Sequence, residues 1–168
     1  LALVPRKPER FEEAARLVTD RGFRLVRRSE TRDRPAEADP EAVVLGDTMG
    51  ELMAFYQLAA CAVIGRSFAP MGGSNPFDPA GLGLPLVFGP HMFNFPEAEE
   101  LFVRSGAARV ARDADSLAET LAEMLESEAT RAAMGERGRE AVRRRQGATQ
   151  ANLALVERAM AQAGATHE

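Results

Sequence analysis

Residues 72–90, GGSNPFDPAGLGLPLVFGP, decide the fold because they combine a turn, a short helix and a buried strand. Two adjacent glycines and an Asn-Pro pair come first, which is typical of a loop that leads into a helix. The run LPLVFG at residues 84–89 is continuously apolar, as expected of a strand buried on both faces of a parallel sheet. This segment therefore predicts a helix followed by a strand of a parallel sheet.

Similar segments lie on both sides of it. Further strands are predicted at residues 1–4, 23–26, 42–46, 61–65 and 107–111. Helical patterns separate them, at residues 8–21, from about 49, from about 76 and at 96–104, and after residue 112 the chain is helical throughout (113–126, 128–145 and 148–163). Residues 27–41 are polar, carry two prolines and predict an exposed loop, in which residues 28–40 are the only plausible insertion. We predict one α/β domain, a Rossmann-like doubly wound parallel sheet of about six strands with C-terminal helices.

Composition excludes several functional classes. The chain has 168 residues, is 45% hydrophobic and carries a net charge of −4, which argues against general nucleic-acid binding. Cys61 is the only cysteine, and His91 and His167 are the only histidines, so neither a metal site nor a bound cofactor is predicted. No apolar run approaches the ~20 residues that cross a bilayer. The chain opens on an apolar strand without Met, so we expect it to be a fragment of a longer protein.

The ligand site is expected where the strands lead into helices. In an open parallel sheet, ligands bind beyond the carboxyl ends of the strands. This rule selects the loops at residues 5–10, 46–51, 65–79 and 89–97, each of which is rich in Gly, Pro or polar residues. We interpret Gly72 and Gly73 as letting the backbone approach a ligand. Ser74 or Asn75 would then cap a helix with Pro76 at its first position, so that free N–H groups face an anion.

Two acids in these loops have two interpretations each. Asp78 either complements the dipole of a helix or accepts hydrogen bonds from ribose hydroxyls. Glu51 either forms a capping box with Thr48 or contacts the ligand, and Gly50 within the first turn of a helix mildly favours the second interpretation. Asp47 is an alternative cap for the same helix.

Arg6 follows the first strand directly, where its guanidinium could bind a phosphate or a carboxylate. His91 could be a catalytic base, although a loop histidine without a visible partner is more often structural. The dinucleotide-binding, P-loop and serine-hydrolase glycine motifs are missing from the sequence.

The same loops resemble a known family. LVPRKPERF (3–11), GDTMGELMAFYQLA (46–59), GGSNPFDPAGLGLPLVFGPHMFNF (72–95) and, more weakly, MGERGREAVRRRQGA (134–148) are similar to the C-terminal half of the 3-deoxy-D-manno-octulosonic acid (Kdo) transferases. These glycosyltransferases move Kdo from CMP-Kdo onto lipid A precursors in lipopolysaccharide biosynthesis of Gram-negative bacteria. The resemblance implies the two-domain GT-B architecture, with residues 1–168 as the C-terminal donor-nucleotide domain.

The resemblance also implies a set of CMP-Kdo contacts. By matching position they are Pro5, Arg6, Met49, Gly50, Glu51, Asn75, Pro76, Phe77 and Asp78. No catalytic residue is implied in this chain, because the family's general base is a Glu of the N-terminal acceptor domain, and neither a cofactor nor a metal is implied. The chain departs from the family at Lys7 (usually His), Arg66 (usually Gly), Ser74 (usually His) and Asp78 (usually Glu, one methylene longer).

For the full-length protein, the resemblance implies a place on the cytoplasmic face of the bacterial inner membrane. The lipid acceptor and the membrane would be contacted only through the missing N-terminal part, and the fragment alone is expected to be inactive. Two alternatives stay open: another GT-B nucleotide-sugar transferase or epimerase, and a non-catalytic nucleotide-binding module.

Overall fold

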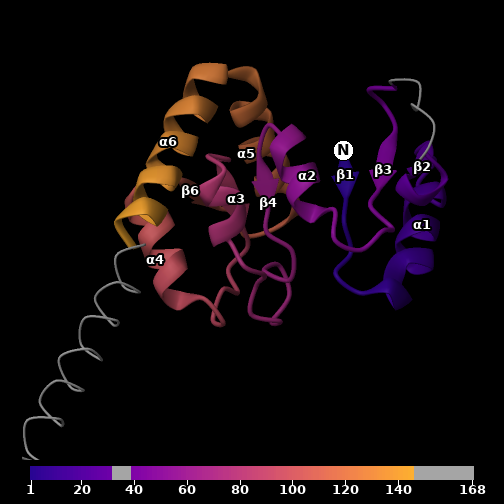
Figure 1. Cartoon of the computed structure of the whole chain (residues 1–168), viewed down its shortest axis with the longest axis horizontal. Coiled ribbons are helices and arrows are strands. Elements are labelled where there is room, and N and C mark those ends of the chain that lie inside the picture. Colours follow the sequence, from indigo (N-terminus) through magenta and orange to yellow (C-terminus); the bar gives the residue numbers. More distant parts are fainter. Residues whose placement is uncertain (32–38, 146–168) are drawn as a thin grey trace, which may run out of the picture. The chain divides into compact units, whose positions relative to one another are not determined.

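A computed structural model describes residues 1–31 and 39–145 of the chain (Figure 1). They form two compact units, Leu1–Leu58 and Ala59 onward, each with its own parallel sheet. The helix predicted at residues 148–163 and part of the loop predicted at residues 27–41 lie outside the described residues.

The first unit is built around a central strand. Strand β3 (Val43–Leu45) pairs in parallel with β1 (Ala2–Leu3) on one side and β2 (Leu25–Arg27) on the other, with Leu3 and Arg27 both opposite Leu45. Helix α1 (Phe11–Thr19) follows a short 3-10 helix, η1 (Pro8–Arg10), and contributes Ala14 and Ala15 to a core with Leu45 and Leu25. A second 3-10 helix, η2 (Arg28–Glu30), follows β2, and α2 (Leu52–Leu58) ends the unit.

The second unit repeats this plan with more helices. Strand β5 (Leu86–Phe88) lies between β4 (Ala62–Val63) and β6 (Ala108–Val110), and all three of its residues are fully buried. The helices are α3 (Phe77–Gly81), α4 (Pro96–Arg104), α5 (Ala114–Glu126) and α6 (Glu128–Arg145). Helix α6, orange in Figure 1, packs against α3, α4 and α5. The core joins β5 to α5 and α6 through Val87, Met124 and Met134.

The predicted α/β class is confirmed, with one difference in the sheet. All six predicted strands form and all pairs are parallel, but the strands make two three-stranded sheets instead of one six-stranded sheet. Strands β1 and β4 are only two residues long, and each pairs with a single neighbour. Short apolar runs indicate that strands exist, but they do not indicate which strand pairs with which.

Three local predictions have distinct outcomes. Of Asp113 and Asp115, the two acids that the sequence offers as caps of this helix, Asp113 caps α5, because its carboxylate accepts a hydrogen bond from the backbone N–H of Ser116 at 2.8 Å. Helix α2 begins at Leu52 and not near Met49, because Gly50 has a φ of +85°, outside the right-handed helical region. Residues 27–30 are not a loop, since β2 continues through Arg27 and η2 follows it directly, although Ser29 and Glu30 are exposed as predicted.

Candidate functional site

The predicted contact residues fall into two groups, one in each unit. Pro5, Arg6, Met49, Gly50 and Glu51 all follow the carboxyl ends of β1 and β3 in the first unit. Asn75, Pro76, Phe77 and Asp78 are consecutive in the second unit, on the connection that follows β4. The structure brings the members of each group to the carboxyl side of their own sheet. That the two groups together form one site stays a prediction.

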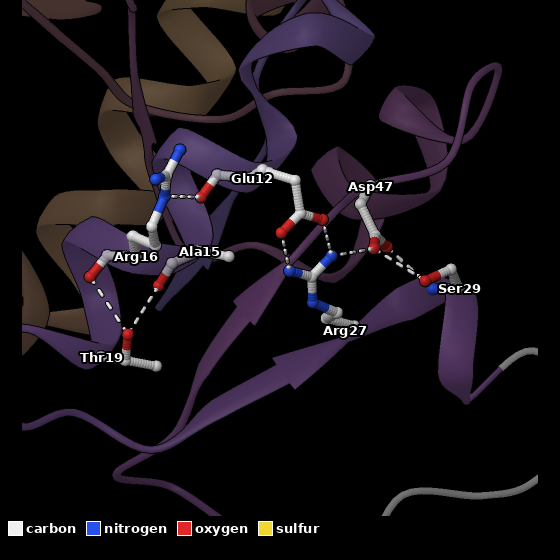
Figure 2. Close-up of polar contacts among 7 residues, drawn as sticks. All are labelled: Glu12, Ala15, Arg16, Thr19, Arg27, Ser29 and Asp47. Atoms are coloured by element: carbon white, nitrogen blue, oxygen red, sulfur yellow. Dashed lines mark hydrogen bonds and ion pairs between the residues drawn. The ribbon is translucent and has the colours of Figure 1, made fainter.

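A network of charged side chains surrounds the carboxyl ends of β2 and β3 (Figure 2). Both terminal nitrogens of Arg27 donate hydrogen bonds to the carboxylate of Glu12 on α1, at 2.7 and 2.9 Å. The same guanidinium lies 3.6 Å from a carboxylate oxygen of Asp47. The backbone N–H and the hydroxyl of Ser29 donate to Asp47 at 2.8 and 2.7 Å. The network therefore connects α1, β2, η2 and the loop that follows β3.

Asp47 is ionised within this network. Its side chain is only 4% exposed, and burial by itself would raise the pKa of its carboxyl. The two hydrogen bonds from Ser29, its own backbone and the nearby charge of Arg27 outweigh burial and leave the pKa below its ordinary value. The sequence suggested Asp47 as a helix cap, but its carboxylate is engaged by Ser29 and Arg27, which are distant in the sequence.

Glu51, at the other end of the same loop, is held by two side chains. Arg28 donates a hydrogen bond from Nη2 to Oε1 of Glu51 at 3.0 Å, and the hydroxyl of Thr48 donates to Oε2. Glu51 is 25% exposed and Arg28 is 30% exposed, so the pair is partly shielded from solvent. Between Thr48 and Glu51, Gly50 adopts a positive φ that glycine tolerates best, with open space where a Cβ would lie. The positive φ explains why glycine stands at position 50, and a place within a helix does not.

The remaining candidates of the first unit are accessible. Arg6 is exposed, and among the described residues no carboxylate pairs with it. Met49 is 65% exposed, and Pro5 is half-buried. An exposed cation and an exposed thioether therefore follow the ends of β1 and β3.

The loops of the second unit are held by neutral hydrogen bonds. Ser67 is fully buried, its hydroxyl donates to the carbonyl of Ile64 at 2.6 Å, and it accepts from the N–H of Gly89 at 2.8 Å. The N–H of His91 donates to the carbonyl of Ser67 at 2.9 Å. The segments that follow β4 and β5 are thus joined through one serine.

Gly72 and Gly73 serve packing within this unit. Both have positive φ values, and a Cβ would lie 2.2 Å from the side chain of Asn94 at Gly72 and 2.4 Å from the sulfur of Met92 at Gly73. Asn94 also donates two hydrogen bonds here, from its backbone N–H to the carbonyl of Gly72 at 3.1 Å and from its side-chain amide to that of Met71 at 3.2 Å. The positions where Cβ atoms would lie at these two glycines are therefore occupied by protein side chains.

The segment before α3 turns as expected, with a shift of one position. The side-chain oxygen of Asn75 accepts a hydrogen bond from the N–H of Phe77 at 3.0 Å. Pro76 is buried and precedes α3, instead of occupying its first position as predicted. Asp78 lies in the first turn with an exposed side chain.

The ring of Phe77 points into the second unit. It lies edge-on to the ring of Phe102, with 5.3 Å between the two ring centroids. The guanidinium of Arg145 lies 5.8 Å from the centroid of the Phe77 ring. Phe77 therefore contributes packing through its ring, and any contact with a ligand at this position would use its backbone.

Two classes of site find no support in the described ranges. Residues 1–31 and 39–145 contain no group of three or more His, Cys, Asp or Glu side chains that could hold a metal ion. No helix in these ranges is both long and apolar enough to cross a membrane. Cys61 is only partly buried, and this burial raises the pKa of its thiol.

Sequence reasoning missed Arg27, Arg28 and Ser29, which it assigned to an exposed loop. A usable signal was present, because two consecutive arginines directly follow the apolar run at residues 23–26. Basic residues at the carboxyl end of a parallel strand lie at the edge where ligands bind.

Comparison with known proteins agrees with the resemblance. A family model described as glycosyl transferase-like matches residues 50–154. The chain is 39% identical over 158 residues to a 3-deoxy-D-manno-octulosonic acid transferase of Haemophilus influenzae and 37% identical over 157 residues to one of Bordetella pertussis. Each match covers 94% of this chain and 36% of the relative, so the chain spans about a third of the length of these relatives.

A solved structure is similar as well. It is the C-terminal CMP-Kdo binding domain of WaaA from Acinetobacter baumannii, with a TM-score of 0.77 and 29% sequence identity. The match covers 84% of this chain and 72% of that domain. The predicted resemblance and the predicted fold are both confirmed.

Proposed function

The chain belongs to the glycosyl transferase-like family, and we propose that it is the donor-binding domain of a Kdo transferase, which binds CMP-Kdo. The observation that carries this proposal is the similarity to a solved CMP-Kdo binding domain over 84% of the chain. Similarity to two 3-deoxy-D-manno-octulosonic acid transferases over 94% of the chain supports the proposal.

The chemistry of the first unit suits a nucleotide sugar. CMP-Kdo carries a phosphate and a carboxylate, and Arg6 is an exposed cation without a carboxylate partner among the described residues. A guanidinium can bind either anion through two parallel hydrogen bonds. Glu51 supplies carboxylate oxygens, which accept hydrogen bonds from ribose hydroxyls, and Gly50 leaves open space beside it.

The second unit would contribute backbone groups and one acid. The N-terminal turn of a helix has N–H groups that no intrahelical carbonyl can satisfy, and these suit a phosphate. Helix α3 has only five residues, so its dipole is small. The donor phosphate would instead be bound by the individual N–H groups that follow Asn75. Asp78, exposed in this turn, would accept hydrogen bonds from the donor.

The remaining parts of the reaction would come from outside this chain. Transfer requires a base that takes the proton of the acceptor hydroxyl as this oxygen attacks the anomeric carbon, and that base would belong to an N-terminal acceptor domain. This chain would instead stabilise the charge on the departing CMP. The acceptor would be a lipid A precursor at the cytoplasmic face of the bacterial inner membrane, reached through the N-terminal part.

Nucleotide titration tests the binding proposal. Isothermal titration of the 168-residue chain with CMP, UDP and GDP should give the tightest binding for CMP, and CMP-Kdo should bind at least as well. A preference for UDP or GDP would instead indicate another nucleotide-sugar enzyme. Chemical-shift changes on addition of CMP should cluster in the loops after β1, β3 and β4, whereas changes confined to α5 and α6 would contradict this site.

An activity assay tests the division of labour. With CMP-Kdo and a lipid A precursor the chain alone should transfer no Kdo, because positioning of both reactants contributes roughly 7–11 kcal/mol to lowering such a barrier. Turnover by the chain alone would contradict the proposal and place the general base in this domain, with His91 as the first residue to substitute.

A further inference from the structure

Two consecutive arginines at the end of β2 engage the two acids that flank one loop. Arg27 is the last residue of β2 and lies 3.6 Å from Asp47, the second residue after β3. Arg28, the next residue, bonds Glu51 at 3.0 Å. The parallel register places Arg27 opposite Leu45, so the end of β2 lies beside the start of the loop at residues 47–51. Each arginine therefore secures one end of this loop.

The contact with Arg28 also determines how the carboxylate of Glu51 is oriented. Arg28 holds Oε1 of Glu51, and the hydroxyl of Thr48 holds Oε2. The two partners come from different segments, η2 and the loop after β3, so together they fix the plane of the carboxylate. A carboxylate oxygen can accept more than one hydrogen bond, so a bond to Arg28 or to Thr48 does not by itself exclude a further donor. Partial shielding from solvent makes such a pair stronger than a fully exposed one.

We propose that Arg28 is a positioning residue, which orients the carboxylate of Glu51 to accept the ribose hydroxyls of the donor nucleotide. This inference rests on the proposed function, because it assigns a role within the CMP site. A free glutamate side chain samples several rotamers, and a ligand that it binds must immobilise it. Arg28 immobilises Glu51 before the ligand arrives, so ordering this side chain does not reduce the free energy of ligand binding.

The test compares CMP with 2′,3′-dideoxy-CMP, which has the same base and phosphate but lacks both ribose hydroxyls. The measured quantity is the ratio of the two affinities, obtained by titration of the 168-residue chain and its variants. Arg28→Gln should lower the preference for CMP about five- to tenfold, the scale of the net contribution of one hydrogen bond. Arg28→Lys, which keeps a cation at this position, should restore part of the preference. Glu51→Gln should lower it similarly, and the double variant should lose little more, because both changes remove one contact.

Arg24→Gln is the matched control. Arg24 precedes β2 at its opposite end and pairs with Asp39 at 2.7 Å, so this variant removes an ion pair next to the same strand but away from the loop at residues 47–51. It should leave the preference for CMP unchanged. Circular dichroism and thermal unfolding establish that each variant is folded, and Arg28→Lys serves as the test if Arg28→Gln does not fold.

The possible results separate this inference from the proposed function. If the native chain does not bind CMP, both are wrong. If it binds CMP and Arg28→Gln weakens both nucleotides equally, Arg28 contacts the phosphate directly or supports the fold, and the positioning role is wrong. An unchanged preference in both Arg28 variants also overturns it and leaves the proposed function intact.

Discussion

The two units hold their loops by different kinds of interaction. In the first unit, charged pairs connect Arg27 to Glu12 and Asp47, and Arg28 to Glu51. In the second unit, the hydroxyl of Ser67 joins the segments after β4 and β5, and glycines make room for neighbouring side chains. The first arrangement depends on charge, and the second depends on volume. Substitutions that change one property should therefore affect the two units unequally.

The largest effect is expected from added volume in the second unit. Gly89 is buried, and a Cβ there would lie 2.4 Å from the carbonyl oxygen of Ser67, an atom of the backbone that cannot turn away. Gly89→Ala should lower the free energy of unfolding by about 3 kcal/mol, as measured by urea denaturation. Gly65→Ala is the control, since a Cβ at that position would meet no atom within 4 Å, and it should change stability by less than about 0.5 kcal/mol. Equal effects would contradict the volume argument.

A large effect on binding is expected from a charge in the first unit. Arg6→Ala should weaken CMP-Kdo binding by about 1.5–3 kcal/mol, the range for charge-assisted hydrogen bonds, and should leave stability unchanged because the side chain is exposed. Calorimetric titration measures the first quantity and thermal unfolding the second. Arg10→Ala removes another exposed arginine of this unit, paired with Glu13, and should not affect binding. An unchanged affinity in Arg6→Ala would remove this residue from the site.

Asp47 tests whether charge stabilises the first unit. Asp47→Asn should lower the free energy of unfolding by about 1–2 kcal/mol at pH 7, because it removes a buried charge that Ser29 and Arg27 engage. Asp20→Asn, an exposed acid at the end of α1, should have an effect below about 0.5 kcal/mol.

The effect of Asp47 should also depend on pH. The folded state lowers the pKa of this carboxyl, so its stabilisation is fully present above the unfolded pKa of about 3.9 and disappears as the pH falls through the folded value. The difference between the native chain and Asp47→Asn should therefore shrink below about pH 4. Urea denaturation at several pH values measures it, and a difference that grows toward acid would have the wrong sign.

The smallest effect concerns the backbone of the second unit. Arg66 has a φ of +64°, a conformation that costs a residue with a Cβ about 1 kcal/mol. Both Arg66→Gly and Arg66→Ala remove its hydrogen bond to the carbonyl of Met71, but only glycine relieves the backbone. Arg66→Gly should thus be more stable than Arg66→Ala by about 1 kcal/mol in urea denaturation. The reverse order would show that the positive φ carries no strain.

Sequence patterns predicted the elements well and their contacts poorly. The apolar runs located all six strands, and Asp113 was one of the two acids predicted to cap α5, where its hydrogen-bond partner Ser116 is only three residues away. The partner of Asp47 was missed because Ser29 lies 18 residues earlier, on a segment interpreted as an exposed loop. Gly72 was interpreted as letting the backbone approach a ligand. Its close contact with Asn94, 22 residues later, produces no recognisable pattern in the sequence around Gly72.

The sequence by itself determined the order of strands and helices and the family, and it predicted the loops at which a ligand would bind. These depend on periodicity and turn residues among neighbours in the chain, where local preferences act. Only the tertiary structure decided that the strands form two sheets and that Arg28 holds Glu51, 23 residues away. Such pairs form because the register of β2 against β3 brings their carboxyl ends together, and register depends on the packing of the whole sheet.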